Sequence, residues 1–268
     1  MPAVTLRRSI AAALSTVFLL SSVVPAAVAQ DVSAVAPEPV SIETALGALM
    51  ASSDAAFETA ASEKLPACKV GDKRTRYVKK KEWKKTLLDT RLRLPRAYKP
   101  WDLVSVARAD IAGSGRVRKK MIDDLRALAK AARRAGKPLA VRSAWRSYDY
   151  QKALFASYVG TYGYSQALKF SARPGHSEHQ LGTTVDFTVG PGVPLSTKFG
   201  DSPSGKWLAR NGWKYGFIMS YPKGMKKWSC YGYEPWHWRY FGRDLAEKIH
   251  RSGQVPRRYL WENFETAP

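Results

Sequence analysis

Three side chains close to two predicted strands have the types and spacing of a metal site. His179 and Asp186 are separated by six residues, in a segment that leads from a loop into the first strand. His237 lies further along the chain, in the second strand. Two imidazoles and one carboxylate leave a fourth coordination position free, as a catalytic zinc that holds a water requires. Glu234, three residues before His237, is then a candidate to take the proton of that water and pass it to a leaving amine.

The spacing alone leaves structural interpretations open, because a histidine in a loop is more often a polar structural residue than a ligand. We expect His176, beside the candidate site, to be structural or exposed, with substrate contact as the alternative. His250, on a predicted final helix, receives no role. Trp236 and Trp238 flank His237 on alternate faces of its strand. We expect them to pack in the core and hold the ligand, with substrate stacking as the alternative.

The hydrophobic pattern predicts the elements that position these residues. Thr183–Val189 is β-branched and aromatic between two glycines, which is typical of a buried strand. Apolar residues recur every three or four positions in Val117–Ala135, which predicts a helix that Gly136 and Pro138 end. The other predictions are a strand-like segment over 78–94, strands at 139–143 and 236–240, and helices at 148–158, 204–211 and 242–250. Because strands and helices do not alternate regularly, we predict an α+β fold with no internal repeat.

The composition describes a strongly basic chain that has enough apolar residues for a core. Its 268 residues include 44 lysines and arginines against 22 aspartates and glutamates, a formal charge of +22. Hydrophobic residues make up 45% of the chain and aromatic residues 12%, which excludes a wholly disordered or fibrous protein. The charge predicts attraction to an anionic partner: nucleic acid, anionic lipid or an acidic polymer of the cell envelope.

The first thirty residues have the pattern of a secretory signal. Arg7 and Arg8 precede an apolar run from Ile10 to about Val24, and Ala27-Val28-Ala29 is a small-residue cleavage signature. An uncleaved anchor is the alternative, because residues 10–29 could just span a bilayer. Export argues against a nucleic-acid partner, permits disulfides, and predicts that the protein is secreted or associated with the cell envelope.

Charge is distributed unevenly behind this signal. Residues 30–63 contain six acidic residues and no basic ones, so 42 basic and 16 acidic residues remain from Lys64 onward, a formal charge of +26. We predict a signal peptide over 1–29, a poorly ordered acidic spacer over 30–66 with a short helix around 42–61, and one folded domain over 67–268. The runs Lys79–Lys81 and Lys84–Lys85 are either a solvated basic face or a surface that binds an anionic wall polymer.

The chain has two cysteines, Cys68 and Cys230, without a C-x-x-C metal or redox pattern. We favour one disulfide that ties the start of the folded region to its far end. Closing so long a loop contributes about 4–5 kcal/mol in the chain-entropy model. Two unpaired thiols are the alternative.

Several ordered motifs resemble the zinc D-alanyl-D-alanine carboxypeptidases of the VanY type. The most specific are S-x-H-x-x-G-x-x-x-D at Ser177–Asp186 and E-P-W-H-W-R-Y at Glu234–Tyr240. The resemblance covers roughly residues 85–250 and also includes Leu87–Pro95, Trp101–Val104, Ser143–Tyr148 followed by Gln151, and Arg173–Gln180. The chain departs from the family at Ala144-Trp145 and Thr183-Thr184, which affects the shape of the pocket more than its reactive groups.

The resemblance implies roles for individual residues. His179, Asp186 and His237 match the zinc ligands, and Glu234 matches the catalytic base. Arg146 matches a residue that binds the substrate through its carbonyl or its terminal carboxylate, and Ser177 and Gln151 match residues that line the same pocket. A guanidinium is also the natural partner of a carboxylate in a confined site, as a carboxypeptidase requires. The family fold is a small α+β domain with a central, mainly antiparallel sheet.

These observations predict an exported zinc carboxypeptidase that removes the C-terminal D-alanine from peptidoglycan stem peptides, by Glu-assisted attack of zinc-bound water. Within the enzyme class, the alternatives are an L,D-carboxypeptidase and a peptidoglycan endopeptidase. From another class, a wall-binding module that keeps the fold is the alternative, although a binder needs no open metal site. The expected partners are stem peptides and, through the basic face, anionic wall polymers or the membrane surface.

Overall fold

The computed structural model describes residues 65–266. The predicted signal peptide, nearly all of the predicted spacer and its short helix lie outside these residues. Within them no helix is both long and apolar enough to cross a membrane. The strands are β1 (Lys73–Arg74), β2 (Leu92–Arg93), β3 (Leu103–Ser105), β4 (Ala112–Gly113), β5 (Arg116–Arg118), β6 (Ala140–Ser143), β7 (Thr184–Thr188), β8 (Phe217–Met219) and β9 (His237–Tyr240).

Helices connect and cover these strands. The α-helices are α2 (Ile122–Arg134), α3 (Tyr148–Tyr162), α4 (Tyr164–Phe170), α5 (Lys198–Asp201), α6 (Pro203–Asn211), α7 (Lys226–Ser229), α8 (Arg243–Arg251) and α9 (Pro256–Leu260). Short 3-10 turns are η1 (Lys80–Glu82), η2 (Val106–Ala109), η3 (Lys119–Met121), η4 (Glu178–Leu181) and η5 (Gly212–Tyr215), and η6 (Trp261–Glu265) is a π-helical turn.

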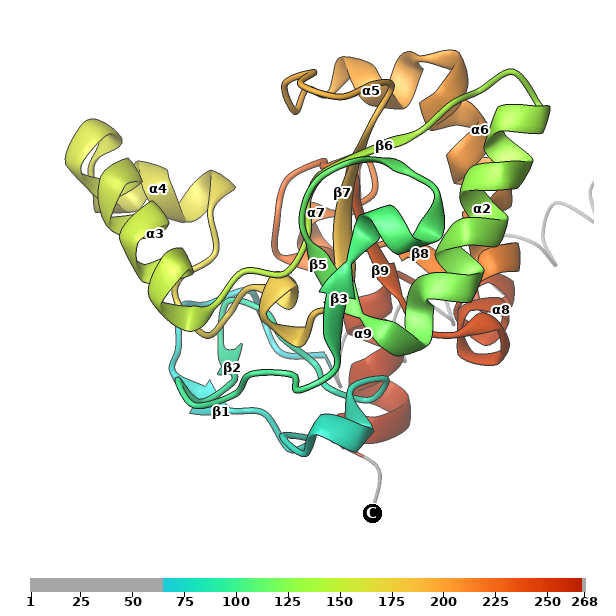
Figure 1. Cartoon of the computed structure of the whole chain (residues 1–268). Helices are drawn as coiled ribbons and strands as arrows, with labels where there is room; N and C mark the ends of the chain where they lie inside the picture. The colour runs from blue at the N-terminus through green and yellow to red at the C-terminus, as the bar shows by residue number, and fades with distance from the viewer. Residues whose placement is uncertain (1–64, 267–268) are drawn as a thin grey trace, which may run out of the picture. The chain divides into compact units, whose positions relative to one another are not determined.

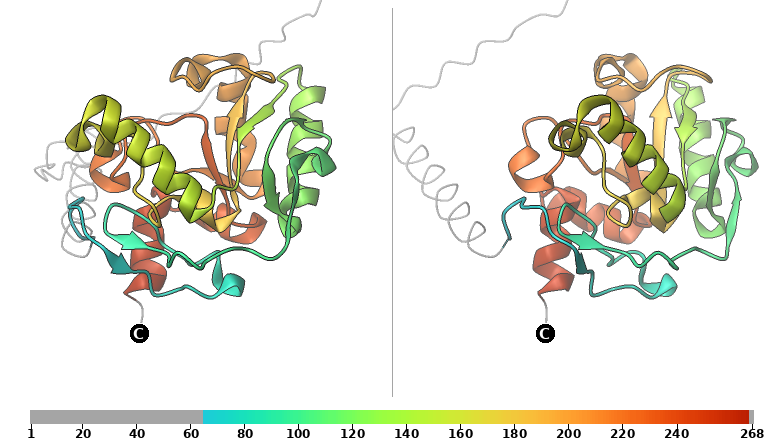
Figure 2. Two further views of the ribbon diagram at one scale, coloured as in Figure 1. Left: turned by 60° about the vertical axis from the view of Figure 1, so that its left-hand side comes forward. Right: turned by 90° about the vertical axis from the view of Figure 1, so that its left-hand side faces the viewer.

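The central sheet has the strand order β4-β6-β7-β9-β8, and all of its pairs except β4–β6 are antiparallel. Helices α2 and α6 lie on one side of this sheet, and the α3–α4 pair lies on the other (Figure 1). After a quarter turn about the vertical axis, α3 and α4 stand in front of the sheet (Figure 2). The predicted α+β fold with a mainly antiparallel sheet flanked by helices is confirmed.

Successive side chains of the middle strand, β7, point alternately into the hydrophobic core and toward the candidate site. All five residues of β7 are buried. Val185 and Phe187 belong to the main hydrophobic cluster, together with Leu125 and Leu128 of α2. Because successive side chains of a strand point to opposite faces, Asp186 lies on the other face of the sheet. A central strand covered on both sides therefore carries one ionisable side chain in a buried position.

Most predicted elements are present, with their ends shifted. The first part of one predicted helix is a strand, and one predicted strand is mostly irregular. The helix expected from Val117 begins at Ile122, because Val117 pairs with Val104 as part of β5. Val117 and Met121 are buried in the same hydrophobic core as the apolar residues of α2. Their four-residue spacing therefore continues the helical pattern of the sequence, although Val117 belongs to a strand.

The prediction of a strand over 78–94 is wrong, because the segment forms η1, irregular turns and the two-residue β2. Its adjacent Leu87 and Leu88 are buried in two separate hydrophobic clusters. The carbonyls of Trp83 and Thr86 accept hydrogen bonds from the Arg239 side chain, at 2.9 and 2.7 Å. A buried side chain therefore holds the middle of the segment, and only its end, β2, pairs with a strand, the two-residue β1.

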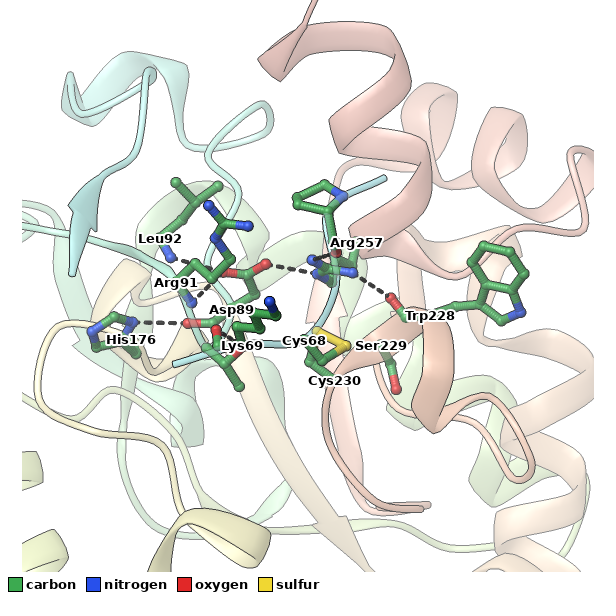
Figure 3. A network of polar contacts seen from close by, with 12 residues as sticks. Cys68, Lys69, Asp89, Arg91, Leu92, His176, Trp228, Ser229, Cys230 and Arg257 are labelled. Atoms are coloured by element: carbon green, nitrogen blue, oxygen red, sulfur yellow. Dashed lines mark hydrogen bonds and ion pairs between the residues drawn. A yellow bond between two sulfur atoms is a disulfide. The ribbon is translucent and has the colours of Figure 1, made fainter. Parts of the chain in front are cut away.

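A buried aspartate organises the junction between this segment and the C-terminal helices (Figure 3). Asp89 Oδ1 accepts the backbone N–H groups of Arg91 and Leu92, each at 2.7 Å. Its Oδ2 accepts the Arg257 Nε–H at 2.7 Å, and its carbonyl oxygen lies 2.8 Å from His176 Nδ1. Asp89 and Arg257 are almost fully buried, so each compensates the charge of the other.

The same junction ties down the beginning of the described chain. Arg257 also donates to the carbonyls of Pro66 and Trp228, at 2.8 and 3.1 Å. Cys68 and Cys230 form a disulfide beside it, across a sequence separation of 162 residues (Figure 3). The favoured pairing thus joins the first described residues to the loop after α7.

Replacing Asp89 by alanine leaves the Arg257 guanidinium buried without a counter-charge. We expect Asp89→Ala to lower the free energy of unfolding by about 3 kcal/mol or more. The matched control is Glu247→Ala, which breaks an exposed ion pair with Arg251 and should cost less than about 1 kcal/mol. Denaturant unfolding measures both, and equal losses in the two variants would contradict the assignment.

Candidate active site

Two neighbouring strands place the first pair of candidate ligands side by side. Asp186 of β7 and His237 of β9 are directly paired in the antiparallel register. His237 Nδ1 lies 3.4 Å from Asp186 Oδ1. Strand pairing therefore brings together two residues that are far apart in the sequence.

The third candidate ligand, His179, comes from the turn η4 immediately before β7. This turn ends at Gly182, whose φ of 74° is left-handed. A Cβ at Gly182 would come within 2.9 Å of Leu103 Cδ2 and 3.1 Å of Arg118 Cγ, so a larger residue would both strain and crowd the turn. Gly182 thereby lets the chain reverse so that His179 Nε2 lies 3.3 Å from Asp186 Oδ2.

The three side chains form a buried donor cluster of the kind that holds a metal ion. One ligand atom from each of His179, Asp186 and His237 lies within 4.8 Å of the others. His179 Nε2 and Asp186 Oδ1 are buried, and no polar atom of the described chain outside the cluster is bonded to them, which leaves them available to coordinate. Two imidazole nitrogens and a carboxylate suit zinc, so the residues present fit this ion.

Hydrogen bonds outside the cluster orient both imidazoles. His179 Nδ1 lies 2.5 Å from the carbonyl oxygen of Ala144, and His237 Nε2 lies 2.9 Å from Glu178 Oε2. When these nitrogens carry the protons, His179 Nε2 and His237 Nδ1 face the cluster as lone-pair donors. The two rings meet edge to face, with centroids 4.9 Å apart at 82°.

Glu178, which lies within the motif at Ser177–Asp186, was given no role from the sequence but contacts a candidate ligand. Its carboxylate accepts hydrogen bonds from Ser220 at 2.6 Å and from Arg239 at 2.9 Å, besides its contact with His237. Burial raises the pKa of Glu178, but the charge of Arg239 and the hydrogen bond with His237 outweigh it and lower the pKa to about 2. The carboxylate is thus held ionised behind the imidazole.

The charges in the cluster favour a cation between the ligands. Burial and the charge of Arg146 lower the pKa of His179 to about 4. Burial also acts to lower the pKa of His237, but its hydrogen bonds with Asp186 and Glu178 prevail and raise it to about 9. For Asp186, burial is outweighed by the charge and hydrogen bond of His179, and the pKa falls far below its usual range. The carboxylates therefore stabilise positive charge at this position, as metal binding requires.

Glu234 lies next to the cluster in the turn before β9. Its backbone N–H donates to the carbonyl of Tyr221, and its own carbonyl accepts the N–H of His237. Glu234 Oε2 lies 3.6 Å from His237 Nδ1. Burial, with the nearby charge of Asp186, overcomes the opposing effect of His237 and raises the pKa of Glu234 to about 7. A carboxyl with this pKa can both accept and return a proton near neutral pH.

The cluster opens into a cavity of about 270 Å³. Arg146 and Ser177 line it together with Glu234, and an Arg146 Nη2–H donates to Ser177 Oγ at 3.4 Å. Arg146 Nε is buried without a hydrogen-bond partner, and no carboxylate of the described chain forms an ion pair with this guanidinium. The positive charge of Arg146 acts to lower the pKa values of both His179 and Glu234, so its electrostatic effect extends across the cavity.

The remaining candidates, Gln151, Trp236 and Trp238, differ in whether they line the cavity or are buried behind it. Gln151 is buried behind the cavity, where its amide donates to the carbonyl of Ala172, a lining residue, at 2.7 Å. It thus holds the wall of the cavity and is not itself part of the lining. Trp236 is partly buried and lines the cavity, whereas Trp238 packs in the main core.

The two other histidines lie outside the candidate site. His176 is buried and contacts the Asp89 carbonyl and, at 3.3 Å, Asp72 Oδ1. Its surroundings are thus structural, as expected. His250 stacks on Trp213, with ring centroids 4.4 Å apart.

Two tyrosines of the cavity wall were also missed from the sequence. Tyr221 and Tyr231 line the cavity, and Tyr221 packs against the His237 ring at 4.6 Å between centroids. Burial raises the pKa of each phenol, so both stay neutral. His237 and Arg239 lie on one face of β9 and both contact the buried Glu178, but their spacing alone does not identify this acid in the sequence.

A buried two-histidine, one-carboxylate cluster with an adjacent glutamate and an unpaired arginine is the arrangement of a metal-dependent hydrolase. The family model described as "VanY: D-alanyl-D-alanine carboxypeptidase" matches residues 114–243. A solved LdcB LD-carboxypeptidase is 37% identical with a TM-score of 0.60, and the match covers 65% of this chain and 83% of that one. The chain therefore belongs to the VanY family of D-alanyl-D-alanine carboxypeptidases.

Two further relatives extend the comparison. A putative carboxypeptidase of Bacillus subtilis, YodJ, is 38% identical over 169 residues, which are 61% of this chain and 62% of that protein. The chain thus matches about three fifths of the length of this relative. A VanY D,D-pentapeptidase from a VanB-type vancomycin resistance cassette, solved in complex with Zn(II), is 28% identical with a TM-score of 0.57 over 66% of this chain and 99% of that one.

Proposed function

We propose that this protein is a zinc carboxypeptidase that removes the C-terminal D-alanine from peptidoglycan stem peptides. The observation that carries the proposal is the unpaired guanidinium of Arg146 in a small cavity that also contains the donor cluster and Glu234. A carboxypeptidase must bind a free terminal carboxylate close to its hydrolytic group, and an arginine without an acidic partner can do so.

Each side chain has a separate task. Arg146 binds the terminal carboxylate or the carbonyl of the substrate and fixes the scissile bond next to Glu234. Glu234 accepts the proton of the attacking water and donates it to the departing amine of D-alanine, so its carboxylate is restored after each turnover. Most of the polar side chains that line the cavity are buried, which strengthens both interactions.

His179, Asp186 and His237 would hold the zinc ion, and Glu178 would orient His237 from behind. Zinc bound there supplies a Lewis acid that polarises the scissile carbonyl and makes a bound water more acidic. The Zn(II) complex of the related D,D-pentapeptidase supports the choice of ion.

Cleavage of an L,D bond is the second candidate, and a specific observation favours it. The LdcB LD-carboxypeptidase is 37% identical to this chain, whereas the VanY D,D-pentapeptidase is 28% identical. Both activities release D-alanine and use the same reactive groups, so the difference depends on the part of the cavity that holds the preceding residue.

Mass spectrometry of products from a defined pentapeptide and a defined tetrapeptide, with and without a zinc chelator, tests both candidates. D-Alanine released from the pentapeptide supports the D,D activity, and release from the tetrapeptide supports the L,D activity. Cleavage inside the stem or cross-bridge would instead indicate an endopeptidase. Lack of a product from every peptide would refute the enzymatic proposal and favour a wall-binding module.

Replacing Arg146 tests the recognition of the carboxylate. We expect Arg146→Gln to lower kcat/KM for the free-acid peptide by about 100-fold or more, since a charge-assisted pair is lost in a buried site. For the same peptide with a C-terminal amide, the substitution should change the much lower rate little. An equal loss on both peptides would show that Arg146 does not read the carboxylate.

We also propose that the protein is exported, since its substrate lies outside the cytoplasm. The sequence pattern of residues 1–29 supports this proposal. Determining the N-terminus of the protein recovered from the cell envelope or medium tests it, and a mature chain that starts at Gln30 is the expected result.

A further inference from the structure

A second hollow, of about 580 Å³, lies beside the predicted basic runs. Four lysines line it: Lys81, Lys84, Lys85 and Lys120. Its one acidic lining residue is Glu82, whose carboxylate accepts the backbone N–H of Lys79 at 3.3 Å. The lining therefore carries a clear excess of positive charge.

The ammonium groups of two of these lysines lie close to the same aromatic ring, that of Trp83. Lys84 Nζ and Lys120 Nζ lie 5.7 and 5.6 Å from the centroid of the Trp83 ring. Within residues 65–266, neither lysine forms an ion pair. The nearby Asp124 is already occupied, because it accepts from Tyr240 and Arg243 at 2.7 Å each. Neither ammonium group is therefore neutralised by a direct ion pair, and Asp102, which acts on Lys120, is itself paired with Arg118.

The floor of the hollow is anchored to the core. The buried Trp83 stacks on Tyr240, with ring centroids 5.5 Å apart at 9°. Arg118 donates to the carbonyl of Lys80 at 2.6 Å, and Arg239 donates to that of Trp83 at 2.9 Å. The backbone that carries Lys84 is therefore fixed, so a ligand would have little backbone to order on binding.

The local field also favours an anion. Burial and the neighbouring charges of Arg118 and Lys84 lower the pKa of Lys120, against the opposing effect of Asp102. Bringing negative charge into the hollow would relieve this repulsion.

We propose that this hollow is a binding site for a phosphate group, with the ammonium groups of Lys84 and Lys120 contacting its oxygens. Compact ammonium charges on residues that line one concavity suit an anion with several oxygens, since each lysine can donate to a different one. The site is separate from the candidate active site, because His237 and Tyr240 stand at opposite ends of β9. Its role is to bind an anionic ligand, free or displayed on a surface, independently of peptide hydrolysis.

Calorimetric titration of the full-length protein with inorganic pyrophosphate tests the site. We expect the double variant Lys84→Gln/Lys120→Gln to raise the Kd for pyrophosphate by about tenfold or more. The matched control is Lys130→Gln/Lys206→Gln, which removes the same charge from two exposed lysines elsewhere and should leave the Kd within about twofold of wild type. Equal weakening in both variants would mean that net charge alone attracts the anion and would overturn the proposal.

A vesicle arm distinguishes the source of the phosphate. Sedimentation with phosphatidylglycerol vesicles, compared with phosphatidylcholine vesicles, tests lipid headgroups against the free anion. Binding to either pyrophosphate or phosphatidylglycerol that the hollow variant loses and the control keeps supports the site and identifies its source. Absence of binding to both would refute it.

Release of D-alanine by the hollow variant should match wild type. Because both tests use the same preparations, failure of the phosphate site and failure of the proposed peptidase function would be seen separately. Unchanged thermal unfolding of both lysine variants confirms that each is folded.

Discussion

Glu234→Gln should reduce kcat for D-alanine release by about 1000-fold or more, because general acid–base catalysis contributes up to about 10⁴. Among residues 65–266, the only other acidic residue that lines the cavity is Asp186, a candidate ligand. Glutamine has nearly the same size as glutamate, but its amide cannot accept and return the proton. Asp186 is a candidate ligand that contacts both His179 and His237, and Glu178 contacts the His237 nitrogen that faces away from the cluster. Rates from single-turnover assays on the preferred peptide measure the effect.

Zinc content separates loss of catalysis from loss of the site. Glu234→Gln should bind zinc with an affinity close to that of wild type, since the ligands are three other side chains. The control for the substitution itself is Glu247→Gln, an exposed glutamate on α8, which should keep full activity. A Glu234→Gln enzyme that works at a rate near wild type would show that another group moves the proton.

Asp186→Asn should abolish stable zinc binding, with a loss of affinity well above about 100-fold, because even residues behind the ligands contribute 10–100-fold. The substitution keeps the shape of the side chain but removes the charge that holds a cation between His179 and His237. Competition with a chromophoric chelator measures the affinity, and the stabilisation of wild type by added zinc should disappear in the variant.

Glu178→Gln provides the graded comparison. It leaves all three ligands in place but removes the negative charge behind His237 and beside Arg239. We expect zinc affinity to fall by about 10–100-fold, less than for Asp186→Asn. If Asp186→Asn weakened zinc binding no more than Glu178→Gln does, Asp186 would not be a ligand.

The local sequence pattern was sufficient to predict the strands and the helix whose own residues show the hydrophobic pattern of that element. The buried strand around Asp186 and the strand at His237 were predicted within one residue of their ends. Their β-branched or aromatic residues are bounded by turns, and this signal depends little on the rest of the chain. The helix observed over 122–134 was predicted over 117–135, so its C-terminal end was within one residue. Its predicted start was too early, because a neighbouring strand is buried against the same core.

Contacts between residues far apart in the sequence determined the structure of segments that the local pattern could not predict. Residues 78–94 are basic and contain scattered leucines, but Arg239, more than 150 residues later, holds their carbonyls. A single sequence contains no signal for such an interaction. The same holds for the hollow around Trp83, where Lys120 joins Lys84 only after the chain has folded.

The sequence by itself singled out the candidate reactive groups, since His179, Asp186, His237, Glu234 and Arg146 all occur in motifs that resemble those of the zinc carboxypeptidases. Only the tertiary structure decided how these groups are supported. Strand register pairs Asp186 with His237, and Glu178 fixes an imidazole from behind. The physical reason is that residue type and local pattern are properties of short segments, whereas burial, charge pairing and the orientation of a ligand depend on residues that meet only when the chain folds.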